Sequence, residues 1–139
     1  MHSNWKETAR ITHEGAESGT VDFGAGVRLL MEAGCDGYEV DFRRARRTYY
    51  MPGGETLELD CIPASGPVAL RFDVAAIRAA IGEAQRMQPG YTYRGFCDKV
   101  TAAGCAGYLV SLPGRRVLYF GRTAETHTEY FPGSAPAIP

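Results

Sequence analysis

Apolar and polar residues alternate along six short stretches of this chain, and apolar residues recur at helical spacing along four longer ones. Alternation over four to eight residues is typical of a strand with one buried face, whereas apolar residues three and four positions apart indicate an amphipathic helix. The pattern predicts helices at about 4–14, 23–34, 73–88 and 92–104, and strands at about 38–42, 48–51, 57–61, 108–112, 117–120 and 125–131.

Four residues at the ends of the predicted helices support these boundaries. Asp73 and Thr92 precede two apolar-periodic stretches, where a side-chain oxygen can accept a hydrogen bond from the first free backbone N–H groups. Gly34 and Gly104 end two helices, because glycine accepts the left-handed conformation that commonly follows a helix.

The chain also matches itself without a gap when it is shifted by 70 positions. Residues 33–60 align with residues 103–130, and ten of these 28 pairs are identical. Self-similarity at a fixed period is the sequence signature of a repeated structural unit. We therefore expect two tandem units that are related by an approximate two-fold axis.

The predicted fold is a single α+β domain in which each unit runs helix, helix, strand, strand, strand. A three-stranded antiparallel meander has one apolar face, and a pair of helices can cover it. We expect the first repeat at about 3–62, a linker at 63–72, the second repeat at about 73–131 and a proline-rich tail at 132–139.

Composition narrows the functional classes only slightly. The chain has 139 residues, of which 45% are hydrophobic and 22% charged, as in ordinary globular proteins. Its net charge of −1 lacks the basic excess that favours non-specific binding to nucleic acid. No apolar run approaches the roughly 18 residues of a membrane span, and the first 15 residues lack an apolar signal core. We expect a cytoplasmic protein that does not contact membranes.

Four cysteines occur, none of them with C-x-x-C spacing: Cys35, Cys61, Cys97 and Cys105. Thiols stay reduced in the cytosol, and small buried cysteines are common packing residues. Cys35 and Cys105 hold equivalent positions in the two repeats. We therefore expect both to be buried, reduced and structural, and Cys61 and Cys97 to be shielded as well.

The two Ala-Gly-Cys-x-Gly-Tyr-x-Val segments, at 33–40 and 103–110, are each followed by an aromatic pair, Tyr49-Tyr50 and Tyr119-Phe120. With these motifs the chain resembles an uncharacterised bacterial and prophage family labelled "phage envelope protein", which has a YdfO-like fold. The likeness runs from about residue 20 to residue 131. It departs at Cys35 and Cys105, where that family commonly has an aliphatic residue. The resemblance implies the two-unit fold and no established chemistry.

The densest group of charges is the run Arg43-Arg44-Ala45-Arg46-Arg47, which precedes Thr48-Tyr49-Tyr50. Four guanidinium groups at a hairpin tip beside two tyrosines could grip phosphates and stack on bases. The alternative is a solvated turn whose arginines pair with nearby acidic side chains of the same sheet. The net charge makes nucleic acid the less expected partner. The residues concerned are Arg43, Arg44, Arg46, Arg47, Tyr49 and Tyr50.

One row of polar residues could in principle support catalysis. Glu125, His127 and Glu129 alternate along a predicted strand and would share one face. They could serve a divalent metal or acid–base chemistry, although three ligands along one strand lie too far apart to converge without a neighbour. The alternative is a solvated sheet edge, where charged residues are common. The sequence contains no G-x-S-x-G elbow, Walker loop or G-x-G-x-x-G motif.

Aromatic residues are concentrated in the predicted strands, and alternation would place several of them on the sheet face that the helices leave free. Exposed tyrosines suit protein contacts, because they bring large area at a small entropic cost. The alternative is aromatic pairing between neighbouring strands, which explains part of the pattern. The sequence thus favours a non-catalytic binding or assembly protein, with an acidic protein or a second copy of itself as partner and with no cofactor or metal. The alternatives are an enzyme that uses His127, Glu125 and Glu129, or nucleic-acid contact through residues 43–47.

Overall fold

The computed structural model describes residues 4–132, and it shows the predicted α+β fold with a six-stranded antiparallel sheet. Residue 132 is thus the only part of the predicted tail, 132–139, inside the described range. In chain order the elements are α1 (Trp5–Ser18), α2 (Phe23–Glu32), β1 (Gly37–Asp41), β2 (Arg46–Tyr50), β3 (Thr56–Asp60), α3 (Val74–Gln85), α4 (Tyr93–Ala102), β4 (Cys105–Ser111), β5 (Arg116–Gly121) and β6 (Thr126–Tyr130).

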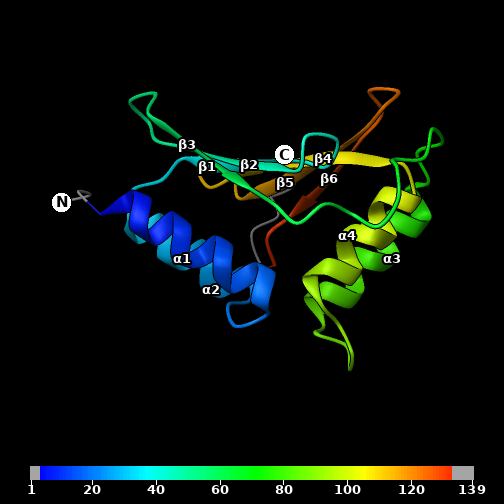
Figure 1. Cartoon of the computed structure of the whole chain (residues 1–139), viewed down its shortest axis with the longest axis horizontal. Coiled ribbons are helices and arrows are strands. Elements are labelled where there is room, and N and C mark those ends of the chain that lie inside the picture. The colour runs from blue at the N-terminus through cyan, green and yellow to red at the C-terminus, as the bar shows by residue number, and fades with distance from the viewer. Residues whose placement is uncertain (1–3, 133–139) are drawn as a thin grey trace, which may run out of the picture.

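The strands follow the order β3-β2-β1-β4-β5-β6, so that β1 and β4 pair at the centre of the sheet. All four helices lie on one side of this sheet, where α1 packs beside α2 and α3 beside α4 (Figure 1). Residues 61–73, which include the predicted linker, contain no helix or strand and connect the edge strand β3 to α3. The two helix pairs lie beneath the sheet, and α1 of the first pair contacts α4 of the second (Figure 1).

Alternation along each strand decides which side chains face the helices. On β1, Tyr38 and Val40 are buried, whereas Glu39 and Asp41 lie on the opposite face and are partly exposed. The other long strands follow the same rule, because successive side chains of a strand point to opposite faces. The apolar inner face and the four helices together form one hydrophobic core that draws on both halves of the chain.

The helix caps form as the sequence predicts. The Asp73 carboxylate accepts a hydrogen bond from the backbone N–H of Ala76, and the Thr92 hydroxyl accepts one from Gly95. Gly34 and Gly104 follow α2 and α4 with φ angles of 84° and 96°. These interactions satisfy backbone groups at the helix ends that have no partner within the helix.

Two helices differ from the predicted pattern. The first was expected at about 4–14 but runs to Ser18, because Gly19 ends it in the left-handed conformation. In α2, Val27 and Leu30 are buried as predicted, but Phe23 and Met31 are 45% and 40% exposed. Met31 lies about 100° around the helix from Leu30, which turns it away from the core. The buried stripe is therefore narrower than the apolar positions suggest.

No helix among residues 4–132 combines the length and the apolar character that crossing a bilayer requires.

We predict that Gly104→Ala lowers the free energy of unfolding by about 3 kcal/mol or more, because the new side chain strains the backbone and clashes with a carbonyl oxygen. The φ angle of Gly104 is +96°, and a Cβ atom there would lie 2.0 Å from the carbonyl oxygen of Arg71. Gly19→Ala is the matched control, since Gly19 has φ +81° with open space around it. It should cost only about 1 kcal/mol. Urea denaturation of both variants measures the difference, and equal losses would contradict the role of the collision.

Candidate functional site: a buried arginine in an aromatic cleft

A cleft of about 460 Å³ opens between the two helix pairs, with the inner face of the sheet as its floor. This volume falls within the range of roughly 300–1,000 Å³ that small-molecule sites occupy. Residues of α1 and α2 form one wall, and residues at the end of α3 and the start of α4 form the other. The lining is largely apolar and aromatic, with few charged side chains. Its main aromatic members are Phe23, Tyr38, Tyr49, Tyr91, Tyr93, Phe96, Tyr108, Tyr119 and Phe131.

Aromatic rings form a continuous row across the floor of the cleft. The ring centroids of Tyr49 and Tyr38 lie 5.3 Å apart, those of Tyr38 and Tyr108 6.4 Å, and those of Tyr108 and Tyr119 5.6 Å. His127 on β6 continues the row at 6.4 Å from Tyr119. Such distances are typical of favourable aromatic pairs. The row makes the floor largely aromatic, and the hydroxyls of Tyr49 and Tyr108 reach Thr12 on α1 and Tyr93 on α4.

Arg47 lies inside this aromatic environment, although it comes from the charged run of the sequence. It is on β2 with the same parity as Tyr49, so its side chain enters the inner face and is only 3% exposed. The guanidinium carbon lies 5.0 Å from the ring centroid of Tyr38 and 5.3 Å from that of Tyr93. Arg47 therefore sits between two aromatic rings, an arrangement that stabilises a cation.

The hydrogen bonds of Arg47 go to tyrosine hydroxyls. One terminal nitrogen, Nη2, donates to Tyr93 at 2.9 Å and to Tyr108 at 3.5 Å, and Nη1 donates to Tyr49 at 3.4 Å. The hydroxyls of Tyr93 and Tyr108 also bond to each other at 2.6 Å. The Nε atom is buried and has no hydrogen-bond partner among residues 4–132. Part of the guanidinium's donor capacity is thus unused.

Nothing in the described part of the chain neutralises the charge of Arg47. No Asp or Glu oxygen of residues 4–132 lies within ion-pair distance of it. Burial raises the pKa of Tyr38 to about 12 and raises the pKa values of Tyr93 and Tyr108 well above their ordinary range. These phenols are therefore neutral at physiological pH, whereas arginine stays protonated.

A buried charge without a counter-ion is costly, because an ion taken out of water loses several kcal/mol of solvation in practice. Hydroxyl dipoles and ring faces offset part of this cost for Arg47. Because its charge is still unpaired, Arg47 is the residue of the cleft that is best suited to bind an anionic group. Guanidinium groups recognise carboxylates and phosphates through paired, charge-assisted hydrogen bonds.

The six residues expected to form one contact surface, Arg43, Arg44, Arg46, Arg47, Tyr49 and Tyr50, do not share a face. Arg47 and Tyr49 are buried in the cleft floor, whereas Arg46 and Tyr50 lie on the outer face of the sheet and Arg43 and Arg44 in the β1–β2 turn. The expectation of four guanidinium groups at the hairpin tip is thus wrong for Arg47, because Arg47 lies within β2 and shares the inward parity of Tyr49.

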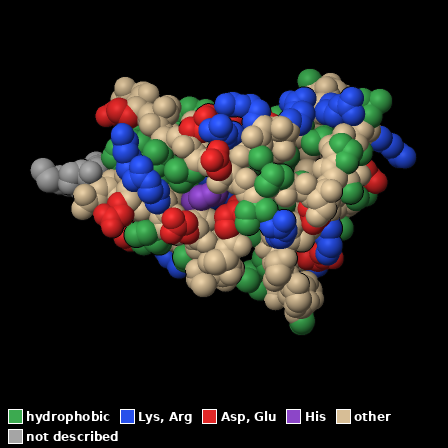
Figure 2. All heavy atoms as spheres, viewed as in Figure 1, with side chains coloured by type: hydrophobic (Ala, Val, Ile, Leu, Met, Phe, Trp, Pro, Cys, Tyr) green, Lys and Arg blue, Asp and Glu red, His purple; other side chains and the backbone are tan. Residues whose placement is uncertain are grey.

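The outer arginines pair with acidic side chains, as the alternative interpretation predicted. Arg44 and Arg46 each form an ion pair of 3.1 Å with Glu58, and Arg46 also contacts Asp60 at 3.2 Å. Tyr50 donates a hydrogen bond to Glu39. Basic side chains lie along the sheet side of the molecule with acidic ones among them (Figure 2). This interspersed charge offers little to a polyanion such as nucleic acid.

The predicted row of Glu125, His127 and Glu129 is only partly assembled. His127 and Glu129 lie on the inner face of β6, and the His127 Nε2 atom is 2.6 Å from a carboxylate oxygen of Glu129. Glu125 precedes the strand and accepts a hydrogen bond from the Thr123 hydroxyl. Glu129 reaches the cleft, and the three side chains do not converge on one point.

The cysteines are free, and Cys35, Cys97 and Cys105 are buried as predicted. Cys61 is partly exposed. Burial raises the pKa of Cys35, Cys61 and Cys105 to about 11 and that of Cys97 to about 12. The four cysteines are therefore protonated at neutral pH, whereas nucleophilic catalysis requires a thiolate.

The sequence interpretation named Arg47 as a contact residue but missed its burial, because Arg47 lies in a run of four arginines that looks uniformly solvent-exposed. A signal was present, since Arg47 shares its parity with the strand-buried Tyr49 and faces Leu59 across the β2–β3 pair. Val117 on β5 occupies the position 70 residues later, and it is buried in the cleft floor without a charge.

No protein-family model and no curated protein matches this sequence. The resemblance to the "phage envelope protein" family therefore stays a prediction.

We predict that Arg47→Met raises the free energy of unfolding by about 1–3 kcal/mol, because it removes a buried charge at nearly constant volume. The tyrosine hydroxyls keep partners in this variant, since Tyr93 bonds to Tyr108 and Tyr49 lies 3.4 Å from the Thr12 hydroxyl. Arg46→Met on the outer face, where the ion pairs are solvent-exposed, should change stability by less than about 1 kcal/mol. Urea denaturation compares the two, and a large loss of stability in Arg47→Met would show that Arg47 serves the fold.

Proposed function

We propose that this chain is a non-catalytic binding protein for small anionic molecules with an apolar or aromatic body. The observation that carries the proposal is the buried, unneutralised Arg47 in the floor of an aromatic cleft. A ligand carboxylate, phosphate or sulfonate would supply the missing negative charge, and its body would fill the space between the helix pairs.

The unused donor capacity of Arg47 supports an anionic partner. Its Nε atom lacks a partner in the described residues, and two of its three hydrogen bonds are long, at 3.4 and 3.5 Å. Hydrogen bonds from a guanidinium to a carboxylate are frequently paired and have N···O distances of roughly 2.7–2.9 Å. An anion would therefore improve the environment of the guanidinium.

The rest of the lining supports an apolar body for the ligand. Phe96 on α4, Tyr119 on β5 and Ile81 on α3 contribute apolar or aromatic surface to the cleft. Ligand sites commonly combine such a lining with a small number of polar groups that fix orientation. A mono- or bicyclic aromatic acid has the matching distribution of charge and apolar surface.

The alternative enzyme function has less support. His127 is held by Glu129, and Glu125 lies outside their strand, so that the three proposed groups do not form a common site. The raised pKa values of the cysteines and of the cleft tyrosines leave these side chains protonated at neutral pH. A protonated thiol or phenol is a poor nucleophile and a poor general base.

We also propose that the two halves are copies of one unit related by an approximate two-fold axis between β1 and β4. Three elements of the second half begin 70 residues after their counterparts, as Phe23 and Tyr93 show for α2 and α4. Glu39 pairs with Leu109, its own repeat mate, at the centre of the β1–β4 register. The cleft would then lie on the pseudo-symmetry axis, between equivalent helix pairs.

We predict that the protein binds 2-naphthoate and that Arg47→Met weakens this binding by about 10–100-fold, as expected for the loss of a hydrogen bond to a charged group. Isothermal titration calorimetry measures the affinity. The neutral isostere 2-naphthamide should bind wild type and Arg47→Met equally, which separates the charge from the packing. Arg46→Met is the control for a general loss of positive charge.

Equal affinity of wild type and Arg47→Met for 2-naphthoate would contradict the proposal. A preference for 2-naphthamide over 2-naphthoate in the wild type would also contradict it.

A second candidate function is protein binding through the outer face of the sheet, which no helix of the described residues covers (Figure 1). Leu109 at the centre of this face is 38% exposed and lies opposite Leu118 in the β4–β5 pair. An apolar residue at the centre of an open face suits a second copy of the chain, since two-fold dimers bury the same patch on both subunits. An acidic partner has less support, because Arg44 and Arg46 are already paired.

If the outer face forms a dimer, Leu109→Arg should convert it to monomers, because like charges would face each other across the two-fold axis. Multi-angle light scattering of the purified protein measures the mass. Leu70→Arg is the matched control, since Leu70 is 61% exposed in the segment between β3 and α3. A monomeric wild type at high concentration would exclude self-association through this face.

A further inference from the structure

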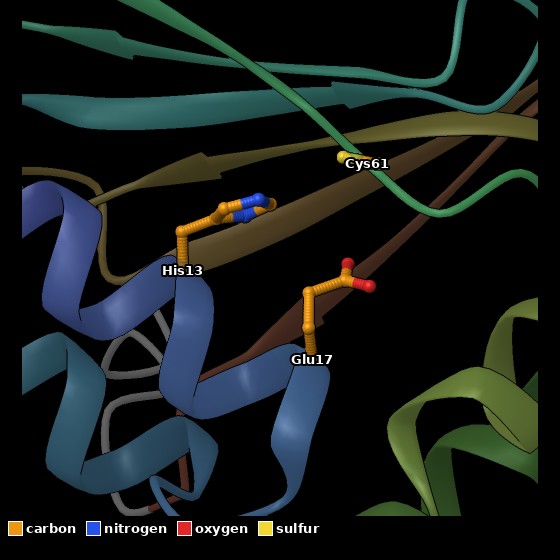
Figure 3. Close-up of side chains that lie close together, drawn as sticks. All are labelled: His13, Glu17 and Cys61. Carbon is orange, nitrogen blue, oxygen red and sulfur yellow. The ribbon is translucent and has the colours of Figure 1, made fainter.

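Three potential metal ligands meet beside the cleft, on the side of the first helix. They are His13 and Glu17 on α1 and Cys61 directly after β3 (Figure 3). One ring nitrogen of His13, a carboxylate oxygen of Glu17 and the sulfur of Cys61 all lie within 4.8 Å of one another. Residues four positions apart lie on the same face of a helix, so α1 presents His13 and Glu17 together toward Cys61.

The hydrogen bonding of His13 prepares it to bind a metal ion. Its Nε2 atom lies 2.8 Å from the backbone carbonyl oxygen of Asp60, and this contact requires Nε2 to carry the proton and donate it. The other nitrogen, Nδ1, then has a free lone pair. Metal-binding histidines commonly donate their second ring N–H to a backbone carbonyl in this way, which fixes the tautomer and the ring orientation.

No described residue forms a hydrogen bond with the Nδ1 atom of His13. His13 is only 8% exposed, and this nitrogen is buried. A buried acceptor that stays unpaired costs about 1–3 kcal/mol. The Glu17 carboxylate likewise makes no ion pair or hydrogen bond with a described residue. Both groups are available to a common ligand.

We propose that His13, Glu17 and Cys61 bind a divalent transition-metal ion, with zinc as the best match. One nitrogen, one oxygen and one sulfur donor suit zinc, whereas calcium and magnesium prefer sites made of oxygen atoms alone. Three protein ligands leave the fourth position of a tetrahedron open. A cavity of about 10 Å³ beside Glu17 and Cys61 is close to the size that one water molecule requires.

This inference goes beyond the proposed function, because it concerns different residues and does not require an anion at Arg47. The two sites are neighbours, since Glu17 also lines the cleft. A metal ion bound there would border the anion site.

Titration of the untagged, chelator-treated full-length protein with Co²⁺ tests the proposal directly. Cobalt takes the same ligands as zinc and makes the site visible. Thiolate binding produces a sulfur-to-cobalt charge-transfer band in the near ultraviolet, and tetrahedral geometry produces strong d–d bands in the visible range. We expect both at one equivalent of Co²⁺ and their loss when Zn²⁺ is added.

Two pairs of variants assign the ligands. Cys61→Ser should abolish the charge-transfer band, whereas Cys35→Ser, which removes a buried thiol outside the cluster, should retain it. Glu17→Gln should weaken Co²⁺ binding by at least about 10–100-fold, the loss that even an outer partner of a metal ligand produces. Glu14→Gln, an exposed residue of the same helix, should leave the affinity unchanged. Circular dichroism establishes that each variant is folded.

A wild-type protein without the charge-transfer band would overturn the proposal, as would a band that persists in Cys61→Ser. Equal affinities of Glu17→Gln and Glu14→Gln would remove Glu17 from the site. These results are independent of 2-naphthoate binding, so failure of one proposal leaves the test of the other intact.

Discussion

The antiparallel pairing of β1 with β4 is the interaction on which the rest of this structure depends. It joins two three-stranded meanders into one sheet, and its register places the apolar faces of both meanders on the same side. Because side chains alternate along a strand, a shift of one residue in this register would turn Tyr38 or Tyr108 away from the helices. The observed register instead places both rings on the inner face, and the two helix pairs then stand on the same side with the cleft between them.

The cleft lies between the two helix pairs, and the inner face of the sheet forms its floor. The walls meet the floor through aromatic side chains, and the hydroxyls of Tyr93 on α4 and Tyr108 on β4 connect wall and floor directly. Arg47 joins this contact from β2, so that its hydrogen bonds link strands of both halves to a helix of the second. The guanidinium of Arg47 thus contacts both halves of the chain, and its charge has no counter-ion among the described residues.

Local patterns predicted most of the fold, since alternation in the strands and the caps at Asp73 and Thr92 depend on neighbours in the sequence. The candidate sites depend on distant residues, and here the sequence was less informative. Arg47 looked like a member of a solvated turn because its partners Tyr93 and Tyr108 lie 46 and 61 positions away. His13 and Cys61 likewise meet only because α1 packs near the edge of the sheet where β3 lies, and no spacing motif links them.

The two ends of the cleft floor carry similar tyrosine rings but different charges. Tyr49 and Tyr38 of the first half correspond in the 70-residue alignment to Tyr119 and Tyr108 of the second, but the position of Arg47 is taken by Val117. One end of the floor therefore carries the positive charge of Arg47, and the other end carries the carboxylate of Glu129, which lies opposite Val117 in the β5–β6 pair. An elongated ligand would meet attraction at β2 and repulsion of its negative end near β6. The two ends of the cleft are therefore not equivalent. An asymmetric molecule would bind in a single orientation, although similar rings line both ends.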